Sequence, residues 1–152
     1  MTQSTAQEEE LSLKLFVVLT RTLQSIKKRA EEDIKCLGLN PTEFAVLELI
    51  YHKGEQPIQK IGEKVLIASS SITYVVDKLE KKQLLVRKPN PDDRRVIFAA
   101  ITEKGTALME EMFPKHKNAM QEIFAGLNMK EKENMIQQLK KLGYYAESNN
   151  IR

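Results

Sequence analysis

Apolar residues recur every three or four positions through the first quarter of the chain, after a polar start. The recurring positions are Leu11, Leu15, Leu19, Leu23, Ile26, Ala30, Ile34 and Leu37. Because this spacing aligns side chains along one side of a helix, we predict one long helix over residues 11–37, ended by Gly38. Residues 1–10 lack the stripe and are predicted to be a disordered leader.

A second helix is predicted to begin after Asn40. This residue can cap the helix, Pro41 suits the first helical position, and Glu43 lies three residues after the cap. Apolar residues continue the helical pattern to Ile50. Residues 52–57 are then expected to form a turn that leads into the first helix of a helix-turn-helix pair.

The second helix of that pair is predicted to start near Ser69–Ser71, whose hydroxyl groups can cap it, and to end near Lys82. Its apolar positions recur at three and four residues and should face the core: Ile72, Val75, Val76 and Leu79. Its polar positions should face outward: Ser69, Ser70, Thr73, Tyr74 and Lys78. A short polar outer face suits a groove of DNA.

Two short apolar runs, residues 84–87 and residues 96–101, predict a pair of strands. The segment KPNPDDRR between them contains two prolines, Asn and Asp, and therefore predicts a turn. Arg94 and Arg95 lie at the far end of this turn, where a hairpin tip exposes side chains to solvent. An arginine at such a tip can enter the narrow minor groove of DNA while a neighbouring carboxylate holds it in position.

Helix, turn, helix and β-ribbon in this order are typical of a winged helix-turn-helix. The predicted fold class is therefore mainly α with a small β-ribbon (α+β), and the predicted partner is double-stranded DNA. The charge distribution agrees, since the net charge of the chain is only +3 while residues 58–105 hold ten Lys and Arg against six Asp and Glu.

Two further helices are predicted after the ribbon. Thr102 can cap the first, and Pro114 interrupts it, so we expect a kink near residues 109–114 or two separate helices. Asn128 and Glu131 repeat the cap pattern at the start of the last helix. The helices at both chain ends therefore carry apolar stripes that the short helices and the ribbon cannot cover, whereas a partner chain could.

Composition excludes several classes of protein. A chain of 152 residues is one domain's worth, and no apolar run approaches the length that spans a bilayer. The acidic, polar N-terminus differs from a signal peptide, so we expect a cytoplasmic protein with no membrane partner. A single cysteine, Cys36, excludes an internal disulfide framework.

Catalytic and metal-binding patterns are missing from the sequence. His52 is expected in a turn and His116 on a helix, and neither lies near a candidate nucleophile in the sequence. No glycine-rich phosphate loop follows a strand, and no residues stand at metal-ligand spacing. We therefore expect no enzyme activity, no cofactor and no metal.

The run DRRVIFAAITEKG, preceded by ITYVVDKLEKKQLLVRKPNPD, resembles the MarR family of bacterial transcription regulators. Asp93 and Arg95 match the Asp-x-Arg motif of that family, and Thr102 to Gly105 match the junction after it. Two departures stand out. The family often has a basic residue where this chain has Ser69 or Tyr74, and it usually has Gly where Gln83 stands, so this turn is expected to place Gln in the left-handed region at some steric cost.

The resemblance covers residues 11–146 and implies a homodimer in a single domain over residues 11–148. The winged helix-turn-helix would occupy residues 40–102, and the terminal helices, residues 11–37 and 103–146, would interdigitate with those of a second copy. On this basis we predict a repressor that binds a pseudo-palindromic operator. The predicted DNA-binding residues are Ser69, Ser70, Ser71, Thr73, Tyr74, Lys78, Lys82, Lys88, Asp93, Arg94 and Arg95. Lysines should contact phosphates, and Ser70, Thr73 and Tyr74 should set base preference.

In this family, small aromatic or phenolic effectors bind where the dimerisation helices meet the winged helix-turn-helix. The residues predicted for such a pocket are Phe16, Phe44, Tyr51, Met109, Met112, Phe113 and His116, although each could instead be a core residue. General likeness to Gram-positive regulators of detoxification suggests a phenolic, quinone or other electrophilic effector.

Two alternatives to this function remain open at the level of sequence. One is a winged-helix protein-interaction module that does not bind DNA. The other is a thiol sensor that uses Cys36. We expect this thiol to be a small packed side chain, because Ile34 and Leu37 flank it and the end of a helix disfavours a thiolate.

Overall fold

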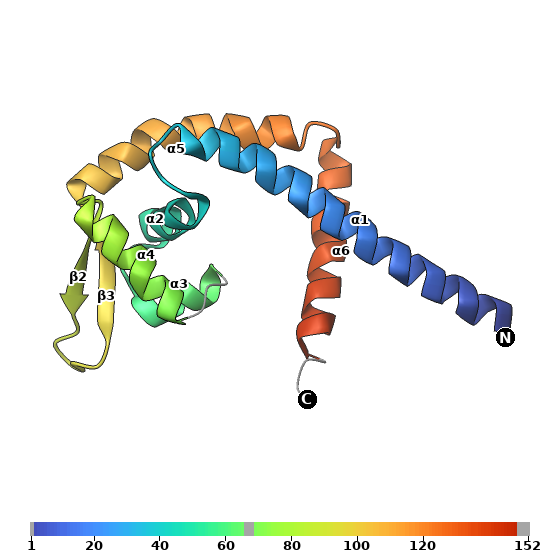
Figure 1. Cartoon of the computed structure of the whole chain (residues 1–152), viewed down its shortest axis with the longest axis horizontal. Helices are drawn as coiled ribbons and strands as arrows, with labels where there is room; N and C mark the ends of the chain where they lie inside the picture. The colour runs from blue at the N-terminus through green and yellow to red at the C-terminus, as the bar shows by residue number, and fades with distance from the viewer. Residues whose placement is uncertain (1, 66–68, 149–152) are drawn as a thin grey trace.

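The computed structural model describes residues 2–65 and 69–148. Six helices and a three-stranded sheet make up this part of the chain (Figure 1). In chain order the elements are α1 (Thr2–Lys35), α2 (Pro41–Lys53), β1 (Gln56–Pro57), α3 (Ile58–Lys64), α4 (Ser69–Lys81), β2 (Leu85–Pro89), β3 (Ile97–Ile101), α5 (Glu103–Ile123) and α6 (Met129–Ser148). This arrangement confirms the predicted mainly α fold with a small β-ribbon. Nowhere in the two described ranges is a helix long and apolar enough to cross a membrane.

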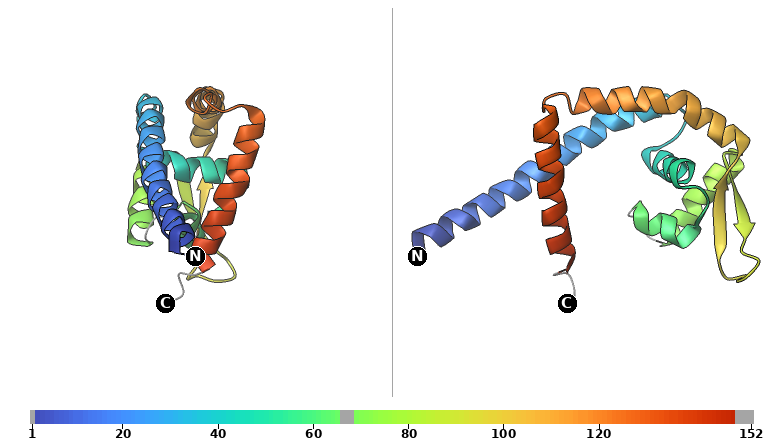
Figure 2. Two further views of the ribbon diagram at one scale, coloured as in Figure 1. Left: turned by 90° about the vertical axis from the view of Figure 1, so that its right-hand side faces the viewer. Right: turned by 180° about the vertical axis from the view of Figure 1, so that it is seen from behind.

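The molecule has a compact lobe and two projecting helices. Helices α2, α3 and α4 and the sheet form the lobe, and α5 arches away from it with α1 packed alongside (Figure 1). The N-terminal half of α1 and the whole of α6 extend away from the lobe in Figure 1 and in the right view of Figure 2. Helix α4 and the β2–β3 ribbon therefore lie apart from the projecting helices.

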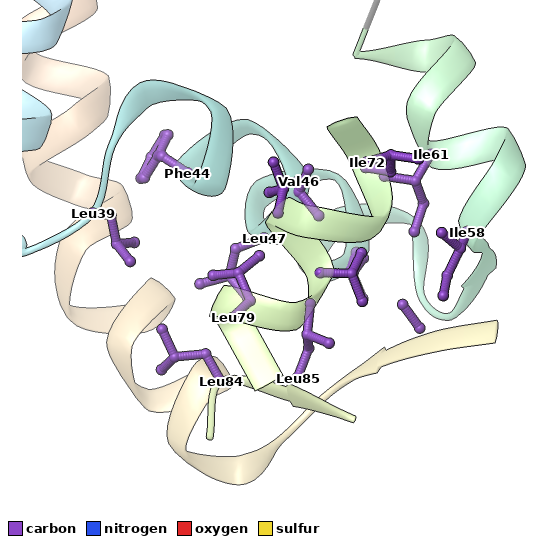
Figure 3. Packing of buried hydrophobic residues seen from close by; sticks show 14 of the residues in the cluster. Leu39, Phe44, Val46, Leu47, Ile58, Ile61, Ile72, Leu79, Leu84 and Leu85 are labelled. Atoms are coloured by element: carbon purple, nitrogen blue, oxygen red, sulfur yellow. The ribbon is translucent and has the colours of Figure 1, made fainter. Parts of the chain in front are cut away.

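The core of the lobe is built from the predicted apolar stripe of α4 (Figure 3). Ile72, Val75, Val76 and Leu79 are all buried, which confirms the predicted inward face. They pack with residues of α2, α3 and the sheet, including Val46, Leu47, Ile50, Ile61 and Leu85. Because the apolar face of α4 is buried in this core, its polar face must point outward.

The sheet contains one strand that the sequence did not reveal. Its order is β1-β3-β2, and both pairings are antiparallel. Gln56 of β1 lies opposite Ala99 of β3, within the segment expected to be a turn. His52, expected in the same turn, lies instead in the last turn of α2, which ends at Lys53. A strand of two residues including a proline has no apolar alternation that could predict it.

The predicted disordered leader is wrong for residues 2–10, because α1 begins at Thr2. These residues include no glycine or proline that would stop a helix. Once the apolar stripe has nucleated α1, each further residue adds one backbone hydrogen bond at little cost. The helix ends at Lys35, and Gly38 follows with a positive φ of 72°.

The connections after the ribbon follow the predicted caps. Asn128 and Glu131 cap α6 reciprocally, since each side chain accepts a hydrogen bond from the other residue's N–H. Pro114 lies inside α5, which remains one helix, so the alternative of two helices is wrong. The ribbon of α5 curves in Figure 1, as a proline that removes one intrahelical hydrogen bond requires.

Hydrogen bonds from Thr102 hold the turn between α4 and the wing, which is the hairpin of β2 and β3 (residues 85–101). Gln83 adopts φ 64°, which confirms the predicted left-handed conformation. The Thr102 hydroxyl donates to the Gln83 carbonyl at 2.7 Å and accepts from the Gly105 N–H at 3.0 Å, so that it caps α5. The Thr102 N–H donates to the Leu84 carbonyl at 3.1 Å. The threonine thus joins the turn after α4 to the start of α5.

Candidate nucleic-acid interface and junction pocket

The outer face of α4 presents the side chains that the sequence predicted. Ser71, Thr73 and Tyr74 are exposed, and Tyr74 exposes 60% of its surface. Ser69 and Ser70 belong to the first turn of α4, but their side chains lie outside the described part of the structure. A helix with one apolar face in a core and one polar face in solvent is suited to lie in the major groove.

Tyr74 and Lys78 form a pair on this face. The Lys78 amino group lies 4.8 Å from the centroid of the Tyr74 ring, as expected for residues four apart on a helix. Hydrogen bonding to Tyr74 is the main cause that raises the pKa of Lys78. Lys78 therefore remains charged at physiological pH and is held beside Tyr74 on the polar face of α4.

The wing tip has the predicted arrangement of an arginine beside a carboxylate. The Asp93 carboxylate accepts a hydrogen bond from the Arg95 N–H at 3.0 Å, and the Arg95 Nε lies 3.6 Å from the same oxygen. The Arg95 side chain is 94% exposed. Arg94 beside it is also exposed. The tip thus offers two cations to a partner while Asp93 restrains one of them.

Two predicted phosphate contacts have partners within the protein. Lys88 lies 3.5 Å from Glu55, but both side chains are more than half exposed, so the pair is weak and leaves Lys88 available. Lys82 is different. Its amino group lies 2.6 Å from the Glu43 carboxylate, which is nearly buried, and donates to the Gly38 carbonyl at 3.0 Å.

The structure therefore shows Lys82 bound to a carboxylate of its own chain, beside the phosphate contact predicted for it. A nearly buried carboxylate without its cation is strongly unfavourable, so the lysine is retained by Glu43. From the sequence, Glu43 was predicted only as part of the cap at the start of α2. Asn40 does accept a hydrogen bond from the Glu43 N–H at 2.8 Å, but the Glu43 side chain points to Lys82.

Sequence reasoning missed the role of Arg87, which it placed only in a strand. Its guanidinium contacts Asp77 at 2.5 Å and Glu80 at 3.0 Å, both on α4. The two acids stand three residues apart and therefore share one side of the helix. That spacing was the available signal, but it does not identify the strand residue that pairs with them.

A pocket of about 280 Å³ lies where α1 meets α5. Its lining is mostly apolar and consists of Asp33, Ile34, Cys36, Leu37, Met112, Lys115, His116 and Ala119. His116 reaches it from α5 and lies 4.7 Å from the Phe44 ring and 4.0 Å from the Glu48 carboxylate. The pocket therefore adjoins the lobe through α2.

Only Met112 and His116 of the predicted pocket residues line this pocket. Phe44 and Met109 are buried in the core, as the alternative interpretation of each held. Tyr51 and Phe113 make edge-on contacts with His52 in an aromatic cluster between α2 and α5. Phe16 is 72% exposed on α1 and is not among the lining residues. The predicted set is thus divided between pocket, core and surface.

Cys36 is exposed and lines the pocket, so the prediction of a packed thiol is wrong. It follows the last residue of α1, and its thiol donates a weak hydrogen bond to the Glu32 carbonyl at 3.9 Å. Its neighbours Ile34 and Leu37 turn inward while the thiol does not. Within residues 2–65 and 69–148, no cluster of three His, Cys, Asp or Glu could hold a metal ion.

Comparison with known proteins agrees with this geometry. Residues 39–97 match the family model described as MarR family. The HTH-type transcriptional regulator MhqR of Bacillus subtilis is 56% identical over 137 residues, which cover 90% of this chain and 94% of that protein. The uncharacterised regulator YkoM of the same organism is 39% identical over 93% of this chain and 92% of its own length.

Solved structures show the same fold. BpsR of Bordetella bronchiseptica, whose DNA binding is regulated by 6-hydroxynicotinic acid, superimposes with a TM-score of 0.77 and 26% identity over 86% of this chain and 98% of that chain. These relatives are regulators, a class that carries out no catalysis, which confirms the prediction that the chain is not an enzyme. The chain belongs to the MarR family of winged helix-turn-helix, DNA-binding transcriptional regulators.

Proposed function

We propose that the protein is a homodimeric repressor of the cytoplasm that binds a pseudo-palindromic operator and releases it when a small aromatic effector binds. The observation that carries this proposal is the outward polar face of α4 beside a wing tip with two exposed arginines. Helix α4 would enter the major groove, and Arg94 and Arg95 would enter the flanking minor groove. These features count against a protein-interaction module without DNA binding.

The wing provides the first test. Genomic fragments retained by the purified protein would identify the operator. Replacing Arg94 and Arg95 with Ala should then weaken operator binding by at least about 2 kcal/mol, the usual worth of charge-assisted contacts. A control that removes two exposed cations from α6, Lys140→Ala with Lys141→Ala, should have a much smaller effect. Equal affinity of the wing variant and the wild type at physiological salt would exclude this role of the wing.

The effector is proposed to occupy the pocket between α1 and α5. Its volume of about 280 Å³ and apolar lining suit one aromatic ring, and Lys115 and His116 could pair with a phenolate or carboxylate. A regulated relative with a small aromatic acid as its ligand, BpsR, supports this class of compound. The protein must have one conformation that fits the operator and another that does not. To release DNA, the effector must have the higher affinity for the second conformation.

The exposure of Cys36 in the same pocket favours a second candidate, in which an electrophile such as a quinone reacts with the thiol. Two variants separate the mechanisms in a reporter assay with the inducer. For noncovalent binding, Cys36→Ser should keep the response, while Ala119→Phe, which fills the pocket, should abolish it. Loss of response in Cys36→Ser with repression retained would instead establish a thiol sensor. Retained response in both variants would exclude the pocket.

A further inference from the structure

Arg87 of β2 contacts α4 at three points along its length. Its Nη2 donates to the Asp77 carboxylate at 2.5 Å and to the Thr73 carbonyl at 3.5 Å, and its Nη1 donates to the Glu80 carboxylate at 3.0 Å. The guanidinium therefore spans two turns of the recognition helix. Its side chain is only 24% exposed, so the contacts are partly shielded from water.

The backbone of Arg87 takes part in the same network. Strand β2 is an edge strand, because the sheet order is β1-β3-β2. Its Arg87 N–H is directed to α4, where the other Glu80 carboxylate oxygen accepts it at 3.1 Å. Glu80 therefore binds both the guanidinium and the strand edge. A planar guanidinium with two carboxylates and a backbone donor restrains orientation much better than a single exposed ion pair.

This restraint joins the two elements that must reach DNA together. Helix α4 and the wing would contact adjacent grooves, so a change in their relative orientation would remove one set of contacts when the other is made. In sequence, the link between α4 and β2 is a short turn with Gln83 in the left-handed region. Arg87 binds the middle of α4 and thereby fixes the strand beyond this turn.

We infer that Arg87, with Asp77 and Glu80, is a positioning residue that sets the wing against the recognition helix and does not itself contact DNA. The inference rests on the proposed roles of α4 and the wing in operator binding. Two other roles compete with it. Arg87 could be a direct phosphate contact, or the network could support folding alone.

Neutralising the two acids separates positioning from direct contact by the sign of the effect. Removing negative charge from a DNA-binding lobe ordinarily strengthens binding to a polyanion. If Asp77 and Glu80 position the wing, the double variant Asp77→Asn with Glu80→Gln should instead bind operator about tenfold or more weakly, the cost of losing an arginine contact with DNA. Glu63→Gln, at an exposed acid of α3 in the same lobe, is the control and should bind as well as the wild type or better.

A second measurement separates positioning from a role in folding alone. In the wild type, Arg95→Ala should weaken operator binding. In the Asp77→Asn, Glu80→Gln background the same change should cost much less, because the wing is no longer placed in its groove. The salt dependence of binding should also flatten, since fewer phosphates and groove contacts are engaged. Thermal unfolding identifies the variants that remain folded at the assay temperature. If the double variant is unfolded at that temperature, the single variant Asp77→Asn is used in both binding measurements.

The outcomes are distinct. Weaker binding by the neutralised variants, with a reduced cost of Arg95→Ala, supports the inference. Unchanged or tighter binding overturns it, and so does a full cost of Arg95→Ala in the neutralised background. If the wild type retains no specific DNA fragment, the proposed function itself fails, and this result differs from failure of the positioning role.

Discussion

Gly105 in the first turn of α5 shows how closely the junction behind the wing is packed. A Cβ atom at this position would lie 2.2 Å from the Leu84 carbonyl oxygen and 2.8 Å from the Ile101 Cγ1. The first of these is a backbone atom, which also accepts the Thr102 N–H. The Thr-x-x-Gly pattern therefore has a physical reason, because threonine caps α5 and glycine allows the turn between α4 and β2 to touch it.

Replacing Gly105 with Ala should lower the free energy of unfolding by about 1–3 kcal/mol, the usual cost of overpacking a well-packed site. The better helix propensity of Ala offsets this by less than about 1 kcal/mol, so the steric term decides the sign. Gly143→Ala in α6 is the matched control, because nothing lies within 4 Å of its Cβ position. Urea denaturation of both variants measures the difference, and equal stability would contradict the packing argument.

Individual site residues could be predicted where the information was local. The polar face of α4 follows from the spacing of Ile72 and Leu79, and the exposure of Arg95 follows from the turn residues around it. Lys82 and Arg87 could not be assigned, because their partners lie on other elements: Glu43 is 39 positions away and Asp77 is 10 away. The sequence around a lysine or arginine does not show whether the side chain will bind a carboxylate or a phosphate.

At the scale of elements, the same limit explains the other differences. The helices with regular apolar spacing were located to within a few residues, except at the start of α1. Strand β1 forms only because β3 provides hydrogen-bonding partners, so Gln56 and Pro57 have no local signal for it. The N-terminal extension of α1 reflects the absence of a stopping residue, which a pattern of apolar positions does not register.

Lys82 connects two elements, since its amino group joins the end of α4 to Glu43 of α2 and to the turn at Gly38. Lys82→Met should therefore lower the free energy of unfolding by about 1–3 kcal/mol, less than for a fully buried pair because its side chain is 39% exposed. If the contact with Glu43 is the main role of Lys82, the change should leave the salt dependence of DNA binding unaltered.

Lys81→Met is the control for this prediction, because Lys81 is the exposed residue just before Lys82, at the end of α4. It should have little effect on stability. Adding Glu43→Gln to Lys82→Met should recover part of the lost stability, since the uncompensated carboxylate is then removed. Thermal and urea denaturation test stability, and a salt series tests the role in DNA binding. A flatter salt dependence for Lys82→Met would show that Lys82 contacts a DNA phosphate.

At the scale of the whole molecule, the projecting helices expose more apolar surface than a monomer explains. Leu11, Leu13, Phe16 and Val18 of α1 are exposed, and none of the described residues of α6 is buried. The exposed apolar residues of α6 include Met135, Ile136, Leu139, Leu142 and Tyr145. Contiguous patches of this kind mark interaction sites, and a second copy of the chain would supply a matching pair of helices.

Replacing Leu139 with Lys should therefore disrupt the proposed homodimer, because a charge would be placed in the centre of the stripe on α6. Leu139 is 44% exposed in the single chain, so the monomeric lobe should retain its fold. The neighbouring change Gln138→Lys adds the same charge at an exposed polar position and should leave the oligomeric state unchanged. Light scattering measures the mass of each variant. The monomeric variant should lose most of its affinity for an operator with two half-sites, but it should still bind a single half-site weakly. A wild-type chain that is monomeric at micromolar concentration would contradict the homodimer directly.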